Sequence, residues 1–244
     1  MGYFKSIKGR DRPLSCVPLA VYILLAVALS GQMFFHSMQP RPVALADDLP
    51  NPPKIDLLNV VSLGEPVTLA KVLMLWLQAF DYQSGISIRF MDLDPVRLSG
   101  WLEKILELDQ KSHYPLIAAS HMYADIPRED TQRIMSEFVL TEFLKDPNRR
   151  WRSLGNIAIL AKHRLNDLPL ALRYAKALAD NATGANVPGW AKQMQFHFLE
   201  DMGEIEAARL FIRGLLASGK VTLPEEINFL NENLERLEQV ADKR

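Results

Sequence analysis

The stretch WRSLGNIAILAKHRLNDLPLALRYAKAL, residues 151–178, has the residue spacing that decides the fold. Its apolar and small side chains recur every three or four positions, first before and then after a polar turn at Asn166–Asp167. They are Trp151, Leu154, Ala158 and Ala161 before the turn, and Leu168, Ala171, Ala175 and Leu178 after it. Side chains with this spacing share one face of an α-helix. The stretch therefore predicts a hairpin of two helices.

A second stretch, WAKQMQFHFLEDMGEIEAARLFIRGLLASG at residues 190–219, repeats this organisation. Its two predicted faces are formed by Trp190, Met194 and Phe198, and by Ile205, Ala208, Ile212 and Leu215. Trp190 follows Trp151 after 39 residues, and Glu204 in the second turn follows Asp167 in the first after 37. A unit that recurs at this distance predicts helical hairpins stacked on one another.

The first unit opens with Trp151, Leu154 and Gly155 in the order W-x2-L-G. This opening resembles that of the tetratricopeptide repeat (TPR). The resemblance covers residues 151–218, and it implies an all-α fold in which TPR-like helical hairpins form a right-handed stack, an α-solenoid. Such repeats act by binding other proteins along an extended surface.

The resemblance also implies that Ala171 and Ala175 are the small residues that let neighbouring helices approach closely. The chain departs from the family in three ways. Its period is longer than the family's 34 residues, Gln193–Met194 stands in place of Leu-Gly in the second unit, and the closing proline is missing. These departures favour TPR-like hairpins over a regular member of the family.

Helical spacing continues through most of the chain after residue 57, and it predicts nine helices in a domain that spans residues 57–244. Their expected ranges are 65–80, 95–108, 113–125, 130–145, 148–164, 167–181, 188–201, 204–218 and 223–240. Asp94–Pro95 and Asp146–Pro147 each place an acceptor at the N-cap and a proline at the first helical position. Residues 85–90 alternate like a strand, but one strand has no partner, so we expect an extended connector there. The last helix has one apolar and one charged face, as a capping helix needs.

The N-terminal region predicts a membrane anchor. A basic segment, residues 1–13, precedes an apolar run at residues 14–35 that contains no charged residue. A helix of that length spans about 33 Å, enough for a hydrocarbon core of about 30 Å. Because positive charge stays on the cytoplasmic side, we expect a single-pass signal-anchor with its N-terminus in the cytoplasm. The alternative is a signal peptide that is cleaved after Ala46, although the long gap from Phe35 to Ala46 favours the anchor.

A proline-rich segment, residues 36–56, separates the apolar run from the helices. Consecutive prolines favour an extended chain that cannot donate backbone hydrogen bonds. The segment is therefore predicted to be a stiff tether that holds the domain near the membrane. The alternative is an ordered arm that packs on the domain.

Composition and motifs argue against several classes of function. The chain has 28 Lys and Arg against 29 Asp and Glu, so it lacks the excess of basic residues that is typical of a nucleic-acid-binding protein. Because Cys16 is the only cysteine, the chain can form neither an intramolecular disulfide nor a metal site built from cysteines. No nucleophile elbow, zinc-protease motif, P-loop or dinucleotide fingerprint occurs. We therefore expect no enzyme activity, no cofactor, no metal and no small-molecule substrate. The five histidines are interpreted as solvated or core-edge residues.

One polar cluster is a candidate binding site for a partner. Arg149, Arg150 and Arg152 crowd the first turn of a predicted helix, where cations oppose the helix dipole and cost a few tenths of a kcal/mol each. Glu142 and Asp146 can offset these charges locally, which is one reading of the cluster. An acidic segment of a partner protein is the other.

Together these features predict a membrane-anchored scaffold or assembly factor of a bacterial envelope complex. Its helical domain would lie in the periplasm, its partners would be proteins in or near the inner membrane, and residues 14–35 would contact the lipid bilayer. Two alternatives stay open: an envelope hydrolase with an unrecognised active site, and a permanent accessory subunit of a membrane complex.

Overall fold

The computed structural model describes residues 17–39, 47–83, 86–219 and 221–241. The chain divides into two compact units, residues 1–45 and residues 46–244, and each is described by itself. Their described residues are almost entirely helical, with one pair of two-residue strands. The all-α class predicted from the sequence is confirmed.

The first unit contains one described helix, α1 (Leu19–Met38), which begins after Pro18. All its side chains are exposed, and the helix is long and apolar enough either to cross a membrane or to serve as a signal sequence. The predicted span, residues 14–35, overlaps α1 but begins earlier, and residues 14–16 lie outside the described part. The basic segment 1–13 and the possible cut site at Ala46 lie outside it as well.

The second unit, called the helical unit below, starts with α2 (Ile55–Val61) and α3 (Pro66–Gln78). Strands β1 (Tyr82–Gln83) and β2 (Ile86–Ser87) and a 3₁₀ turn, η2 (Phe90–Asp92), lead to α4 (Pro95–Leu108). A short α5 (Tyr114–Ile117) continues into a π-helical turn, η3 (Ala118–Tyr123). The remaining helices are α6 (Glu129–Lys145), α7 (Pro147–His163), α8 (Leu168–Asn181), α9 (Gly189–Asp201), α10 (Ile205–Ala217) and α11 (Pro224–Ala241).

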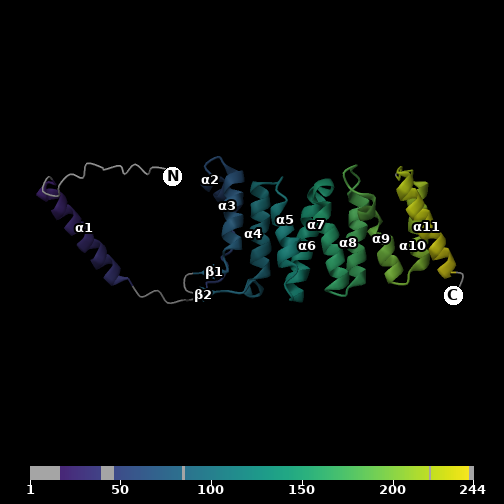
Figure 1. The fold of residues 1–244 in the computed structure, drawn as a ribbon, viewed down its shortest axis with the longest axis horizontal. Coiled ribbons are helices and arrows are strands. Elements are labelled where there is room, and N and C mark those ends of the chain that lie inside the picture. Colours follow the sequence, from purple (N-terminus) through teal and green to yellow (C-terminus); the bar gives the residue numbers. More distant parts are fainter. Residues whose placement is uncertain (1–16, 40–46, 84–85, 220, 242–244) are drawn as a thin grey trace, which may run out of the picture. The chain divides into compact units, whose positions relative to one another are not determined.

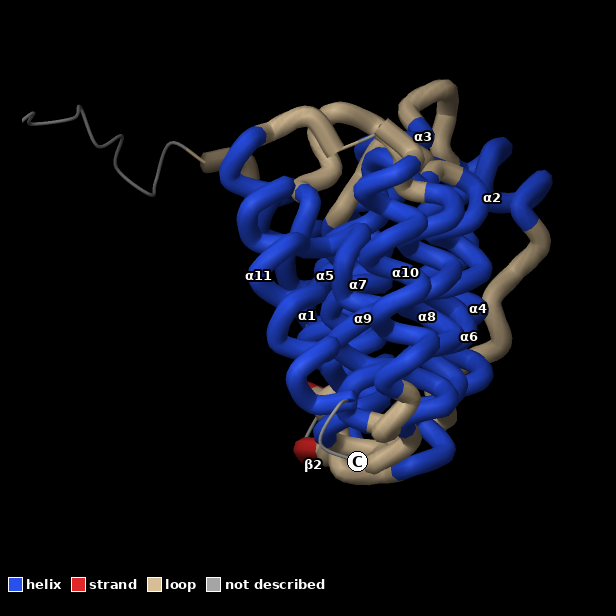
Figure 2. Tube along the Cα trace, turned by 90° about the vertical axis from the view of Figure 1, so that its right-hand side faces the viewer, coloured by secondary structure: helices blue, strands red, loops and turns tan. Residues whose placement is uncertain are grey.

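Most helices of this unit pack on those that follow them in the sequence, and Figure 1 shows them in that order from α2 to α11. Figure 2 shows the α2–α3 end and the β2 end at opposite tips of the helices. Eight of the nine predicted helices are confirmed to within one or two residues at each end. The ninth, at 113–125, is split, because α5 ends after four residues and the chain continues as a π turn.

Two elements differ from the predictions. The short helix α2 was missed, because its seven residues are too few to show a helical period. The stretch predicted as an extended connector contains β2, which pairs antiparallel with β1 over two residues each. Residues 88–89 between β2 and η2 belong to no helix or strand, and residues 84–85 lie outside the described part.

The core contains the apolar faces that the sequence predicts. Ala158, Ala161, Ala171 and Ala175 have no exposed surface, so α7 and α8 pack through small side chains as expected. Trp190 departs from its predicted face, because more than half of its surface is exposed at the start of α9. Its ring still meets that of Trp151 edge to face, with centroids 5.6 Å apart.

The C-terminal part of the predicted tether packs on the helical unit. Leu49 is buried, its carbonyl accepts from Arg97 Nη1 at 2.8 Å, and the Pro50 carbonyl accepts from Trp101 Nε1 at 2.8 Å. Pro52 lies so close to Gly100 that a Cβ at that glycine would be 2.9 Å from the proline ring. Residues 47–54 therefore form an ordered arm, the alternative to a free tether, while residues 40–46 lie outside the described part.

Several polar contacts between separate segments of the unit join residues at a similar separation along the chain. While other polar contacts, such as Arg150–Glu142 and Arg213–Glu238, join closer residues, seven join residues 34 to 39 positions apart: Ser120–Asn156, Asp125–Arg164, Arg133–Asp167, Glu137–Arg173, Asn148–Gly184, Lys162–Asp201 and Glu200–Arg236. This separation is close to the period of 37 to 39 residues read from the sequence. The last helix, α11, buries Leu230 and Leu237 and exposes Glu225, Glu232 and Glu235, the two faces predicted for it.

Candidate functional site

The arginine cluster lies at the start of α7. Pro147 takes the first helical position after Asp146, as predicted, but the Asp146 side chain makes no capping hydrogen bond. Its carboxylate instead lies 3.2 Å from Nε of Arg149, with both side chains partly exposed. This pair offsets one of the cations that crowd the positive end of the helix.

Arg150 lies inside the fold, where 4% of its side chain is exposed. Its Nη1 donates to the carboxylate and to the backbone carbonyl of Glu142 on α6, both at 2.7 Å. Its Nη2 donates to the carbonyl of Gln110, at 3.1 Å, which ties the loop after α4 to α7. A buried ion pair holds its partners strongly in place, since removing one leaves the other charge buried without compensation. Arg150 thus joins α6, α7 and the loop after α4.

A hollow of about 330 Å³ opens over this buried pair, between α4, α6 and α7. Its polar lining contains four cations and three carboxylates: Lys111, Lys145, Arg149 and Arg150, with Glu107, Glu142 and Asp146. Glu142 is buried, whereas Lys111 and Lys145 are exposed and Arg149 is partly exposed. Without the buried Arg150–Glu142 pair, three cations and two carboxylates remain, an excess of one cation. We call this feature the basic hollow.

Arg152 does not belong to the basic hollow. It is exposed, and its guanidinium lies over the ring of Trp151, 4.9 Å from the ring centre. Trp151 in turn meets the exposed ring of Trp190 on α9. The three predicted arginines therefore have three different environments: Arg149 at the rim of the hollow, Arg150 beneath it and Arg152 over a tryptophan.

Sequence reasoning missed the other cations of the hollow. Lys111 belongs to the loop after α4, and Lys145 ends α6. Nη1 of Arg150 and Nζ of Lys145 bind different oxygens of the Glu142 carboxylate. The only sequence signal was the crowding of charge around Asp146–Pro147, because Lys111 is far away along the chain and is brought in by packing alone.

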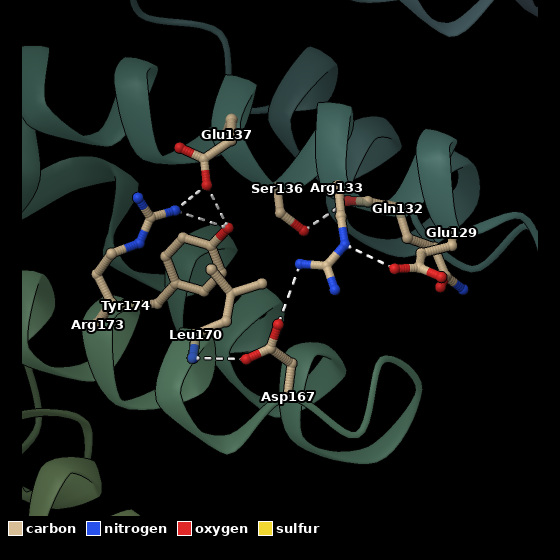
Figure 3. A network of polar contacts seen from close by, with 9 residues as sticks. All are labelled: Glu129, Gln132, Arg133, Ser136, Glu137, Asp167, Leu170, Arg173 and Tyr174. Carbon is tan, nitrogen blue, oxygen red and sulfur yellow. Dashed lines mark hydrogen bonds and ion pairs between the residues drawn. The ribbon is translucent and has the colours of Figure 1, made fainter.

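A second polar surface lies between α6 and α8, in an open groove of about 460 Å³ (Figure 3). Arg133 donates to Glu129 at 2.9 Å and to Asp167 at 3.0 Å, and these hydrogen bonds raise the pKa of the arginine. Asp167 also caps α8 by accepting from the backbone of Leu170.

On the other side of this groove, Glu137 is paired with Arg173 and accepts from the Tyr174 hydroxyl at 2.7 Å. Burial raises the pKa of Tyr174, although the neighbouring Arg173 opposes the shift. Figure 3 shows these side chains turned toward one another across the groove. Because the charged side chains pair with one another within the groove, these contacts hold α6 and α8 together.

The histidines have ordinary surroundings. His121 and His163 line a shallow hollow between η3 and α7, beside the ion pair of Asp125 and Arg164. His197 lies at the edge of the core: much of its surface is exposed, its ring contacts that of Phe196, and partial desolvation of the imidazole there lowers its pKa. Within the described residues, no three His, Cys, Asp or Glu side chains come close enough together to hold a metal ion.

Asp94 and Asp92 have local partners. Asp94 caps α4 by accepting from the backbone N–H groups of Val96 and Arg97, as predicted. Asp92 is paired with Arg89.

No family model matches the chain, and no curated protein or solved structure matches it.

Proposed function

We propose that this chain is a single-pass protein of the bacterial inner membrane whose helical unit binds another protein on the periplasmic side. It would act as a scaffold or assembly factor for an envelope complex. Helix α1 provides an apolar segment of sufficient length, and the basic residues that precede it favour an N-terminus in the cytoplasm.

A repeating arrangement of TPR-like hairpins is part of this proposal. It is supported by the recurring separation of the polar contacts and by the edge-to-face contact of Trp151 with Trp190, the first residues of the two predicted units. Stacked hairpins expose long continuous surfaces, which is how repeat proteins bind their partners.

The basic hollow is the observation that carries the binding proposal. Its exposed cations, Lys111, Lys145 and Arg149, lie on three different segments that the buried Arg150–Glu142 pair holds together. Segments that are already held together lose little backbone freedom when an anionic group binds between them. The expected ligand is therefore an acidic segment of a partner protein.

Affinity capture of the full-length protein from solubilised membranes of its source tests this proposal. The variant Lys111→Glu with Arg149→Glu reverses two exposed charges of the hollow. It should keep the fold, because a carboxylate in the first turn of α7 suits the helix dipole. The matched control is Lys176→Glu with Arg164→Glu, which reverses two exposed charges outside the hollow.

We expect the wild type and the control to recover the same partner in near-stoichiometric amount, and the hollow variant to lose it. Circular dichroism and thermal unfolding should show all three proteins equally folded. Recovery of the wild-type protein alone would contradict the scaffold. Equal recovery by both variants would keep the scaffold and remove the hollow as its binding site.

A further inference from the structure

The arm, residues 47–54, is fastened to the helical unit at its first residue. The Gln83 side chain of β1 accepts from the backbone N–H of Asp47 at 2.7 Å and donates to the Asp47 carbonyl at 2.8 Å. A side-chain amide that bonds both groups of one residue satisfies them as a neighbouring strand would. The chain that comes from α1 therefore reaches the helical unit beside β1.

The next residues of the arm lie against the first half of α4. Leu49 is 1% exposed and belongs to the core of the unit. Arg97 and Trp101 donate to the carbonyls of Leu49 and Pro50, both at 2.8 Å. The hydrogen bonds hold the backbone of the arm, while the buried leucine sets its register. The arm is thus docked by the same means as an extended peptide that binds to a protein surface.

Docking moves the point at which the chain from α1 joins the unit. If the arm were free, this chain would join the unit at Ile55, the first residue of α2. With the arm docked, the junction lies at Asp47 beside β1. The α2–α3 end and the β2 end are opposite tips of the helices (Figure 2). The arm therefore carries the junction from the start of α2 to the β1–β2 tip.

Docking also halves the length of free chain between α1 and the unit. Because α1 ends at Met38, residues 39–46 are free when the arm is docked, and residues 39–54 are free when it is not. Eight residues reach at most about 28 Å when fully extended, and sixteen reach about 56 Å. These limits come from the covalent chain alone, so they hold wherever α1 lies relative to the unit.

The basic hollow lies toward the other end of α4. Arg97 is in the first turn of α4, whereas Glu107 near its end and Lys111 just after it line the hollow. From Arg97 to Glu107 the helix rises by about 15 Å. The junction with the chain from α1 and the hollow are therefore at opposite ends of α4, and a tether at one end leaves the other free for a partner.

We propose that the arm is a strap that fastens the chain from α1 to the β1–β2 tip, so that this tip faces the membrane and the basic hollow faces away from it. The inference rests on the proposed anchoring by α1, and it deepens the proposed function by setting the orientation in which the hollow meets a partner. A free arm would double the tether and let either end of the unit approach the lipid.

Two insertions of the same long, flexible Gly/Ser segment test the strap in the full-length protein in phosphatidylcholine vesicles. One lies before the arm, between Ala46 and Asp47, and the other after it, between Lys54 and Ile55. They add equal length to the chain and replace no side chain. If the arm is docked, the first insertion lengthens the tether, whereas the second forms a slack loop within the unit at a small entropic cost.

Resonance energy transfer to acceptor dyes on the lipid headgroups measures the distance from the membrane. In a Cys16→Ser background, a single cysteine carries the donor dye. It replaces either Tyr82, which is 80% exposed in β1, or Leu144, which is 51% exposed next to Lys145 of the hollow. The two positions report the two ends of the unit.

We expect the insertion before the arm to lower the transfer from position 82 several-fold, and the insertion after the arm to leave it at the wild-type value. In the protein without an insertion, the transfer from position 82 should exceed that from position 144 several-fold.

Three results would overturn the strap while the anchor stands. Equal losses with both insertions would show that the arm is part of the free chain. Unchanged transfer with both would show that something other than the arm holds the tip near the lipid. Equal transfer from positions 82 and 144 would show that the unit has no fixed orientation. A protein that does not float with the vesicles in a density gradient would instead remove the anchor, and the strap with it.

A point variant tests the docking itself. Leu49→Asp places a carboxylate where the leucine is buried, which should release the arm. In this variant the insertion after the arm should lower the transfer as much as the insertion before it. The matched control is Leu57→Asp on α2, where the leucine is 56% exposed, and it should keep the wild-type response.

Circular dichroism should show both point variants folded. A folded Leu49→Asp protein that keeps the wild-type response would overturn the inference. If Leu49→Asp unfolds the unit, the comparison of the two insertions still decides, because neither insertion alters a packed side chain.

Discussion

Helix α6 contains two glutamates five residues apart. Each pairs with an arginine of a neighbouring helix, but one pair is buried and the other is exposed to water. Glu142 pairs with Arg150 of α7, and about 3–4% of each side chain is exposed. Glu137 pairs with Arg173 of α8, and about half of each side chain is exposed. Water screens the exposed Glu137–Arg173 pair and competes for its hydrogen bonds, whereas it does not reach the buried Glu142–Arg150 pair. Breaking the buried pair should therefore cost more stability than breaking the exposed one. The buried pair shapes the basic hollow, and the exposed pair braces its neighbours.

The largest effect should come from breaking the buried pair. Replacing Arg150 by Met leaves the Glu142 carboxylate buried with only Lys145 beside it, so we expect a loss of about 3–5 kcal/mol in the free energy of unfolding. Denaturant titration of the helical unit within the full-length protein measures this loss. The double variant Arg150→Met with Glu142→Leu should recover most of it, because no uncompensated charge remains. A loss below about 1 kcal/mol in the single variant would show that the pair is solvated.

An intermediate effect is expected at Tyr174, whose hydroxyl donates to Glu137. The Tyr174→Phe variant loses that hydrogen bond, at a cost of about 1 kcal/mol at pH 7. Burial raises the pKa of Tyr174 above its ordinary value, so the folded state holds the proton more tightly than the unfolded state. This contribution is complete below about pH 10 and is lost as the pH rises toward the folded pKa.

The difference in stability between wild type and Tyr174→Phe should therefore shrink above about pH 10, as measured by urea titrations at several alkaline pH values. Tyr123, whose pKa burial raises to about 12, is present in both proteins and does not affect the comparison. A difference that stays constant or grows with pH would contradict the assigned direction of the shift.

The smallest effect is expected for the exposed pair. Arg173→Gln should cost about 0.2–1 kcal/mol, and added salt should reduce this cost further. Arg164→Gln is its matched control, since Arg164 forms an equally exposed pair with Asp125. Thermal unfolding at low and high salt would measure both. A cost at Arg173 that approaches the one at Arg150 would erase the distinction between the two pairs.

The two ends of the helical unit show how far sequence patterns could be read. At the C-terminal end, the alternation of leucines and glutamates in α11 predicted a capping helix, and the exposed glutamates and buried leucines confirm those faces. At the N-terminal end, the prolines of residues 36–56 predicted a tether, but residues 47–54 pack on α4 and α2 follows. Composition alone could not show this packing, because Leu49 and Pro50 find their partners about fifty residues further along the chain.

By itself, the sequence determined the apolar N-terminal segment, the all-helical class and the bounds of most helices, because helical period and capping act over a few neighbouring residues. It also located the charge that crowds the start of α7. Only the tertiary structure decided what each arginine does there. Arg149, Arg150 and Arg152 lie within four positions of one another, yet a helix turns each residue by about 100°, so one faces a hollow, one the core and one a tryptophan. The strength of each arginine's interactions depends on how deeply it is buried, and its burial depends on helices that are far apart in the chain.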